Sequence, residues 1–451
     1  MHTLAIAKQV VGSNPLTDVS AVEAAKIGLL DYIASSLMAQ NEEELKILQS
    51  VYGVKLKDGI CTALQTEQTE STRAVCNGFR AHLLDIDDVH GDVRGHPGAV
   101  ILSALLAAAT PQTSGEIFLA AYIIGVEVMA RLGEALNPEH YLKGWHNTFT
   151  LGTVGAAAAL SRLFELNAEQ TAQAMGAAAT QSAGLRAQFG SSVKAMHIGF
   201  AARNALEAVR LIQAGLNGEK EALFKKFGFF EVYGAAVAIE EKLRERYEAP
   251  FKKEWEKSWK ISNPGLWLKK YPFCSAALPA ADAALALRSR RTYKKQDIKK
   301  IEIGFFAGKD SALYARNPKT AEEGRFSPEY IIWLGLLGIP YSIENFSTKP
   351  LRKEIQEDLK RITRFQIEDS NCQPYTQVKV FCQDGSCDIE SVSCPKGSPQ
   401  NPLSLADEME KLAFSVPDEA QRSRLVSAVM NLEKTTIDEL LVKISGEQMN
   451  R

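Results

Sequence analysis

The sequence has almost no net charge and lacks a long apolar run. Lysine plus arginine number 52 and aspartate plus glutamate number 54, so the formal net charge is −2. This balance argues against a general nucleic-acid binder, because such proteins carry a basic excess on the face that meets phosphate. The most apolar stretch, residues 99–109, covers about half of the roughly 20 residues that a membrane-spanning helix needs. We therefore expect a globular protein that binds neither nucleic acid nor membrane.

Cysteine is scarce, and no secretory signal is visible. The seven cysteines are odd in number, and the first residues show no basic region followed by a long apolar core. Free thiols in a reducing cytoplasm are therefore expected rather than a disulfide framework. The length of 451 residues allows two to three folding units at roughly 150 residues each.

Histidine is missing from the second half of the chain. All seven histidines lie in the first 200 residues: His2, His82, His90, His96, His140, His146 and His197. Any acid–base chemistry by histidine must therefore come from the N-terminal part, and imidazole is the side chain whose ordinary pKa lies nearest neutral pH.

The first 250 residues follow a helical pattern, because apolar residues recur at three- and four-residue spacing. One helix is expected over 153–164 and the next over 168–181, with Asn167 as its N-cap. A further helix is expected over about 197–214, ending at Gly215. The many alanines and glycines let helix axes approach closely, so a compact bundle is expected.

The pattern changes near Asn263-Pro264-Gly265, which is a turn signal. Alternating residues predict strands over 300–305 and 376–381. Helices are expected around and between these strands, over 279–288, 328–337 and 351–361. The chain from residue 405 onward is expected to be helical again.

These patterns predict a mainly α fold. We expect a large helical domain and a smaller α+β domain, and the C-terminal helices could pack back on the first domain, which would make the α+β domain an insertion. The boundaries are placed at residues 1–264 for the helical domain, 265–401 for the α+β domain and 402–451 for the C-terminal helices.

The richest stretch of titratable residues is 82–90, which holds two histidines and three aspartates. If it continues as a helix, Asp85 shares a face with His82. Acidic residues are unfavourable at a helix C-terminus because the helix dipole repels negative charge there. The three aspartates are therefore expected to have a function, such as orienting nearby histidines. Pro97 suits the first turn of a following helix, which places His96 beside free N–H groups that can bind a substrate carboxylate. The alternative is a solvated, acidic helix end.

A metal site is another interpretation of a histidine–aspartate cluster. The spacing lacks the paired CxxC or HExxH patterns of common zinc sites, so no metal is expected. Cys382, Cys387 and Cys394 are spaced irregularly on or near predicted strands, and unligated thiols are expected there.

A second candidate is the segment 188–199. Ser191 and Ser192 belong to a loop with free amides, and Lys194 and His197 follow at helical spacing. A cation and an imidazole beside open N–H groups suit a carboxylate-rich ligand. The alternative, an exposed lysine and a capping histidine, is the commoner fate of such residues.

Two shorter motifs complete the set. Lys269-Lys270-Tyr271-Pro272-Phe273-Cys274 lies at the expected domain junction, where clefts form, although a pair of lysines is usually surface charge. Gly144-Trp145-His146-Asn147 puts a histidine beside an aromatic at an expected helix start, and a histidine packed in the core is its alternative.

In this order, the motifs resemble the signature of the MmgE/PrpD family. The matching strings are Asn77-Gly78, His82-Leu83-Leu84-Asp85-Ile86-Asp87-Asp88, His96-Pro97-Gly98, Gly144-Trp145-His146, Gly190-Ser191-Ser192-Val193-Lys194 with His197 and Gly199, Lys269-Lys270-Tyr271-Pro272, Arg325-Phe326-Ser327-Pro328-Glu329-Tyr330 and Gly397-Ser398-Pro399-Gln400-Asn401-Pro402-Leu403-Ser404. The resemblance covers nearly the whole chain. It implies a large all-helical domain formed by both chain ends, to which residues 402–451 return, with an inserted α+β lid domain. It also implies a homodimer, an active site in the cleft between the two domains, and no metal or organic cofactor.

The resemblance also implies particular site residues. The catalytic positions map onto Asp85, His96, His146, Lys194 and Lys269. The motifs themselves, apart from the resemblance, lead us to expect substrate binding from Ser191, Ser192, His197, Lys270 and Cys274.

Three positions depart from the family's pattern. Val89 stands where cis-aconitate decarboxylases carry threonine, and Cys274 where they carry histidine. Leu278 stands where related members often have another histidine. In motif detail the chain is similar to the cis-aconitate decarboxylase and iminodisuccinate epimerase branch more than to 2-methylcitrate dehydratases.

The first hypothesis is a cofactor-independent lyase or isomerase acting on a small di- or tricarboxylate, of the cis-aconitate, 2-methylcitrate or iminodisuccinate type, through a carbanion. Lysines stabilise the negative charge, His96 and His146 move protons, and Asp85 orients one imidazole. The segment 265–401 is expected to close as a lid that brings Lys269 to the substrate.

The rival hypothesis is a catalytically silent, polycarboxylate-binding homologue. The departures also bear on the reaction, because Cys274 supplies a thiol of ordinary pKa about 8.5 in place of an imidazole near roughly 6.5. We expect little or no decarboxylation of cis-aconitate and more tolerance for a proton-shuffling or elimination reaction.

Overall fold

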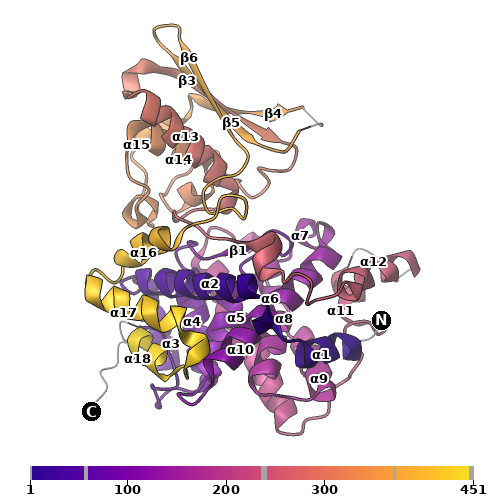
Figure 1. Cartoon of the computed structure of the whole chain (residues 1–451). Coiled ribbons are helices and arrows are strands. Elements are labelled where there is room, and N and C mark those ends of the chain that lie inside the picture. Colours follow the sequence, from indigo (N-terminus) through magenta and orange to yellow (C-terminus); the bar gives the residue numbers. More distant parts are fainter. Residues whose placement is uncertain (1–2, 55–58, 235–240, 369–371, 446–451) are drawn as a thin grey trace. The chain divides into compact units, whose positions relative to one another are not determined.

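A computed structural model describes residues 3–54, 59–234, 241–368 and 372–445 of the chain, and its fold is mainly α-helical (Figure 1). The chain divides into two compact units. The helical unit comprises the residues up to Leu83, Asp87–Leu268 and the residues from Ser404 on, and the α+β unit comprises Leu84–Ile86 and Lys269–Leu403. Among the described residues, no helix combines the length and the apolar character that crossing a membrane requires.

The helical unit contains helices from both ends of the chain. Its helices are α1 (Thr3–Gly12), α2 (Val19–Met38), α3 (Glu44–Tyr52), α4 (Glu70–His82), α5 (Pro97–Ala108), α6 (Gly115–Leu136), α7 (Glu139–Leu142), α8 (Asn147–Leu163), α9 (Ala168–Ala179), α10 (Ser192–Gln213), α11 (Phe229–Tyr233), α12 (Glu241–Lys252), α16 (Leu405–Ala413), α17 (Glu419–Met430) and α18 (Asp438–Ser445). All twelve residues of α5 are buried, which explains the apolar run as a core helix instead of a membrane span. Leu412, Leu425 and Leu441 of the last three helices are buried in the same core.

The predicted helix over 168–181 is observed as α9, two residues shorter at its end. Asn167 caps it as predicted, because its side chain accepts from the Gln170 N–H while the Gln170 side chain accepts from the Asn167 N–H. The predicted helix over 197–214 begins earlier, at Ser192, so Ser192 lies in the first turn of α10 rather than in the predicted loop.

Two details of the helical prediction were wrong. The stretch 82–90 does not continue as a helix, because α4 ends at His82 and Asp85 has a φ of 54°, in the left-handed region that aspartate tolerates better than most residues. The unit is also not purely helical, since β1 (Val89–His90) pairs antiparallel with β2 (Leu266–Trp267).

The α+β unit is built on a four-stranded sheet. Its strands are β3 (Ile298–Phe306), β4 (Ile362–Ile367), β5 (Thr376–Cys382) and β6 (Cys387–Val392), in the order β4-β3-β5-β6. Only the β3–β4 pair is parallel. Helices α13 (Leu278–Arg290), α14 (Pro328–Leu337) and α15 (Lys353–Leu359) complete the unit, and α13 packs against β5 and β6 (Figure 1).

The sequence predicted the two central strands and missed the two edge strands. β5 buries every second residue, which produces the alternation on which the prediction rested. The outer strand β6 has no buried residue, and its apolar alternation is limited to the exposed Cys387 and Ile389. An edge strand of this kind is recognised only when its partner is in place.

Helices α4 and α10 approach so closely at Gly78 that any side chain would collide. A Cβ at this position would lie 2.6 Å from both the N and the Cα of Gly199. We expect Gly78→Ala to destabilise the protein by about 1–3 kcal/mol, because the two backbones must separate. Urea unfolding measures this loss.

Gly12→Ala is the matched control, because a Cβ there would have no atom within 4 Å. Its stability should be unchanged. Equal stability of the Gly78→Ala protein and the natural protein would show that the helices are not in such close contact.

Candidate active site

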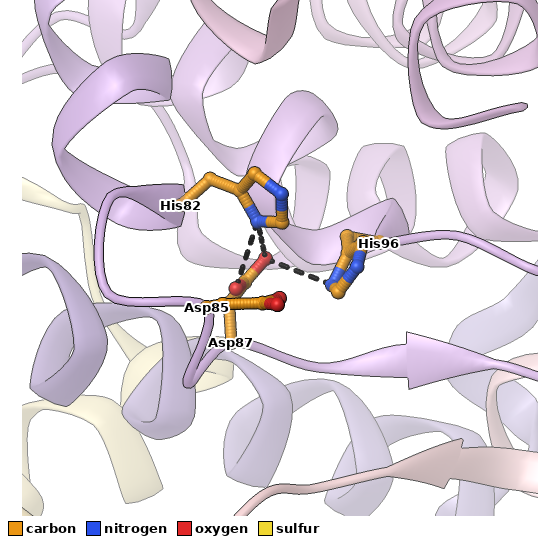
Figure 2. A group of neighbouring side chains, drawn as sticks. All are labelled: His82, Asp85, Asp87 and His96. Carbon is orange, nitrogen blue, oxygen red and sulfur yellow. Dashed lines mark hydrogen bonds and ion pairs between the residues drawn. The ribbon is translucent and has the colours of Figure 1, made fainter. Parts of the chain in front are cut away.

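The end of α4 and the start of α5 bring two histidines onto one carboxylate. His82 is the last residue of α4, and His96 is the N-cap of α5. The Nδ1 atom of His82 lies 2.9 Å from both carboxylate oxygens of Asp87, and the Nδ1 atom of His96 lies 3.1 Å from Oδ2 (Figure 2). Asp87 therefore bridges the two imidazoles, and this arrangement fixes the orientation of both rings.

The bridge is buried, which determines its charge state. Burial lowers the pKa of His82 to about 3, so its imidazole is neutral at neutral pH and donates its Nδ1–H to Asp87. Burial opposes the charge on Asp87 as well, but His82 and His96 outweigh this effect and lower the pKa of its carboxyl well below the usual value. The result is a neutral imidazole held by an ionised carboxylate.

The neighbouring Asp88 holds the other side of this loop. Its main-chain carbonyl accepts a 2.7 Å hydrogen bond from the Nδ1–H of His96, which leaves Nε2 as the basic atom of that ring. Its carboxylate accepts from the N–H of Gly98 at 2.9 and 3.1 Å. The sequence predicted that the amides beside His96 are available to a substrate, and this was wrong for Gly98, because Asp88 already uses its N–H.

A second pair of histidines comes from α8 and α10. His146 is the N-cap of α8, and its Nδ1 atom lies 2.9 Å from Nδ1 of His197 in α10. Burial, and then the charge of Lys194, hold the pKa of His146 well below its usual value. The same two causes lower the pKa of His197 to about 4. Both imidazoles are therefore neutral at pH 7.

The two histidine pairs are neighbours. The ring centroids of His82 and His96 are 4.3 Å apart, and those of His82 and His146 are 6.3 Å apart. Lys194 is buried in the first turn of α10, and its charge also lowers the pKa of His82. The helical unit therefore brings four imidazoles together, and the charge of the buried Lys194 lowers the pKa of three of them, His82, His146 and His197.

Of the predicted site residues, the structure brings together His96, His146, Lys194 and His197 in this way. Ser191 is the N-cap of α10 and is exposed, and Ser192 follows it as a half-buried residue. The hydroxyl of Ser191 donates to the carbonyl of Gln188.

The remaining predicted residues belong to the α+β unit. Lys269 is buried, and its Nζ donates to the carboxylate of Asp85 at 2.8 Å and to its carbonyl at 2.7 Å. Lys270 and Cys274 follow in the same segment and are half-buried. Leu278, one of the three expected departures from the family's pattern, is buried in the core of this unit.

His82 and Asp87 were not among the predicted site residues, although the structure places both in the histidine cluster. The prediction that Asp85 orients an imidazole stays a prediction, and the structure adds Asp87, whose carboxylate bonds both His82 and His96. The left-handed turn at Asp85 brings Asp87 back to His82 at the end of α4. The sequence carries no clear signal of this turn. The sequence feature that could have indicated His82 and Asp87 is the high density of histidine and aspartate in residues 82–90.

His82, Asp87 and His96 are also residue types that bind divalent transition metals. The Nδ1 atom of His96 bonds the carbonyl oxygen of Asp88, so its Nε2 atom is the one that can take a proton or a metal ion. Figure 2 shows the hydrogen bonds and ion pairs that join His82, Asp87 and His96.

These features describe a mainly helical protein with a buried site of imidazoles, one carboxylate and one lysine. The chain belongs to the MmgE/PrpD family: the family's N-terminal domain matches residues 5–242 and its C-terminal domain matches residues 271–433. The expectation from the motifs was correct at this level.

Several curated proteins are similar over most of their length. The chain is 27% identical to the cis-aconitate decarboxylase-like protein oryM of Aspergillus oryzae, over 94% of this chain and 93% of that protein. It is 25% identical to the cis-aconitate decarboxylases of Aspergillus terreus and Mus musculus, in each case over 80% of this chain, and over 78% and 75% of those proteins.

Proposed function

We propose that the protein is a lyase or isomerase that acts on a small di- or tricarboxylate through a carbanion, without a metal or organic cofactor. The observation that carries the proposal is the cluster of buried, neutral imidazoles beside Lys194. Neutral imidazoles can accept or pass on a proton, and a buried ammonium attracts a substrate that bears carboxylates. The names of the similar proteins support a tricarboxylate as the first substrate to test.

The chemistry needs a base, an acid and a positive charge. His96 takes or returns a proton through Nε2, since its Nδ1–H is directed at the Asp88 carbonyl. His146 serves as the second proton-transfer group, with His197 holding its Nδ1. Lys194 stabilises the charge that develops beside the carboxylate in the transition state.

The proposal assigns supporting roles to the other predicted residues. Ser191 and Ser192 offer polar groups at the start of α10, and Lys270 and Cys274 contribute to substrate binding. Lys269 supplies a second positive charge, positioned by its ion pair with Asp85. An α+β lid that delivers Lys269 on closure is part of the same proposal.

The test is turnover on a panel of cis-aconitate, 2-methylcitrate, citrate and iminodisuccinate, followed by proton NMR so that every product is seen. We expect turnover of at least one compound, unchanged by a chelator. Activity that vanishes with the chelator and returns with a divalent metal would refute the cofactor-free mechanism. Thermal stabilisation by several polycarboxylates without turnover of any would favour the silent binding protein.

The departures from the family pattern predict a low rate of carbon dioxide release. Val89 lies in β1, and Cys274 begins the segment before α13. We expect the natural protein to release little carbon dioxide from cis-aconitate, and the double variant Val89→Thr, Cys274→His to release more, since an imidazole replaces a thiol. Manometry or a coupled carbonate assay measures this. A natural rate of about 1 per second or more would contradict the prediction.

A further inference from the structure

Arg186 is a half-buried cation that has no acidic partner among the described residues. Its guanidinium carbon lies 3.6 Å from the ring centroid of Tyr141 and 5.7 Å from that of Phe189. One Nη atom donates to the carbonyl of Tyr141 at 2.9 Å. Its Nε is buried and has no hydrogen-bond partner within the part of the chain that the structure describes.

A second arginine lies beside the same tyrosine. The guanidinium carbon of Arg94 is 5.8 Å from the Tyr141 ring centroid, and the residue is exposed. The charge of Arg94 contributes to lowering the pKa of Glu139, but Glu139 forms its ion pair with Arg246, whose hydrogen bond is the larger cause. Two guanidinium groups thus flank one aromatic ring, and neither forms an ion pair within the described ranges.

The backbone ties Arg186 to the candidate active site. Its N–H donates to the carbonyl of Gly144 at 2.8 Å, and the N–H of His146 donates to the carbonyl of Gly184 at 3.0 Å. The short 3-10 helix Arg186–Gln188 then leads to Phe189. The Phe189 ring centroid is 5.1 Å from that of His146 and 5.3 Å from Nζ of Lys194. Arg186 therefore lies within the segment 184–189, whose two ends contact His146 and Lys194.

A partly desolvated guanidinium without an anion costs free energy, and its planar donors match a carboxylate in two parallel hydrogen bonds. We propose that Arg186, with Arg94 beside it, is a second carboxylate subsite that holds the carboxylate farthest from the reacting carbon and makes the protein prefer tricarboxylates over dicarboxylates. The role in specificity rests on the proposed function, because Lys194 and the histidines are assigned there to the reacting part of the substrate.

Binding of two unreactive probes tests the subsite without any turnover. Propane-1,2,3-tricarboxylate and pentanedioate differ by one carboxylate, and titration calorimetry on the full chain measures the Kd of each. We expect the natural protein to bind the tricarboxylate more tightly, and Arg186→Gln to weaken that binding by about 10- to 100-fold while changing the dicarboxylate Kd by less than about threefold.

Arg203→Gln is the matched control. Arg203 also stacks on an aromatic ring, that of Phe200 at 4.9 Å, and bonds the amide oxygen of Asn204, so its replacement removes the same charge elsewhere in the helical unit. Both Kd values should stay unchanged. Arg94→Gln removes an exposed charge with little risk to folding, and a loss of about 3- to 10-fold for the tricarboxylate alone is expected.

Retention of the tricarboxylate preference in both Arg186→Gln and Arg94→Gln would overturn the subsite, as would equal affinity of the natural protein for the two probes. A matching kinetic effect, with KM raised and kcat unchanged for a tricarboxylate substrate, supports it. The two proposals fail separately. If the natural protein turns over no substrate but the arginine variants lose the preference for the tricarboxylate probe, the subsite stands and the proposed function fails. If the natural protein turns over a substrate but both variants keep that preference, the subsite alone is refuted.

Discussion

Replacing His96 by asparagine is expected to lower kcat by about 10²- to 10⁴-fold, the range typical of a lost general acid or base. The asparagine amide can still donate to the carbonyl of Asp88, as Nδ1 of His96 does at 2.7 Å. The variant therefore removes Nε2 and keeps the contact that holds the loop. The measurement is initial rate against substrate concentration for whichever polycarboxylate the natural protein converts.

His90→Asn is the control for this experiment. His90 is also buried, but its ring bonds the carbonyl of Lys260 and the N–H of Asp92 rather than the carboxylate of Asp87. Its kcat should stay within about threefold of the natural value. If the His96→Asn variant converts the same substrate with the kcat of the natural protein, His96 takes no part in the mechanism.

Lys411→Met is expected to cost about 3–5 kcal/mol of folding stability, because it leaves buried acids without their cation. The Nζ atom of Lys411 in α16 bonds the carboxylate of Asp31 in α2, and both side chains are buried. Glu408, one turn before Lys411, is also buried, and neither of its carboxylate oxygens has a hydrogen-bond partner within the described part of the chain. Urea unfolding of the full chain, followed by circular dichroism, measures the loss.

The double variant Asp31→Asn, Lys411→Met separates charge from packing. It removes the cation and one acid together, so it should be more stable than Lys411→Met alone. Lys46→Met serves as a surface control, since Lys46 and its partner Glu43 are both exposed and such pairs contribute little. A double variant that is no more stable than the single one would show that lost packing, rather than an unpaired charge, causes the effect.

This cluster also makes stability depend on pH. Burial and the charge of Asp31 raise the pKa of Glu408 to about 8, against an ordinary value near 4.5. Between these values the folded chain keeps a proton that the unfolded chain has lost, so stability falls as pH rises from about 4.5 to about 8. We expect Glu408→Gln to remove this part of the pH dependence, which unfolding curves at pH 6 and pH 8 will show.

The elements of the fold could be predicted wherever local pattern and packing agree. Asn167 followed by Gln170 marks the start of α9, and Pro328 marks the start of α14, whose predicted range of 328–337 is the observed one. The central strand β5 alternates because one face is buried. The edge strands β4 and β6 were missed, because their half-exposed residues carry no comparable alternation.

The sequence by itself determined the composition of the candidate site. Histidines confined to the first 200 residues, aspartates crowded into 82–90 and Lys194 beside a serine loop already indicated carboxylate chemistry and the family. Only the tertiary structure decided which groups meet. The carboxylate of Asp87 bonds both His82 and His96, and a left-handed turn at Asp85 separates it from the end of α4. Arg186 reaches Tyr141 because segments some forty residues apart pair through their backbones. Residue type sets the chemistry that is available, whereas a turn and a backbone pairing set the distances over which that chemistry acts.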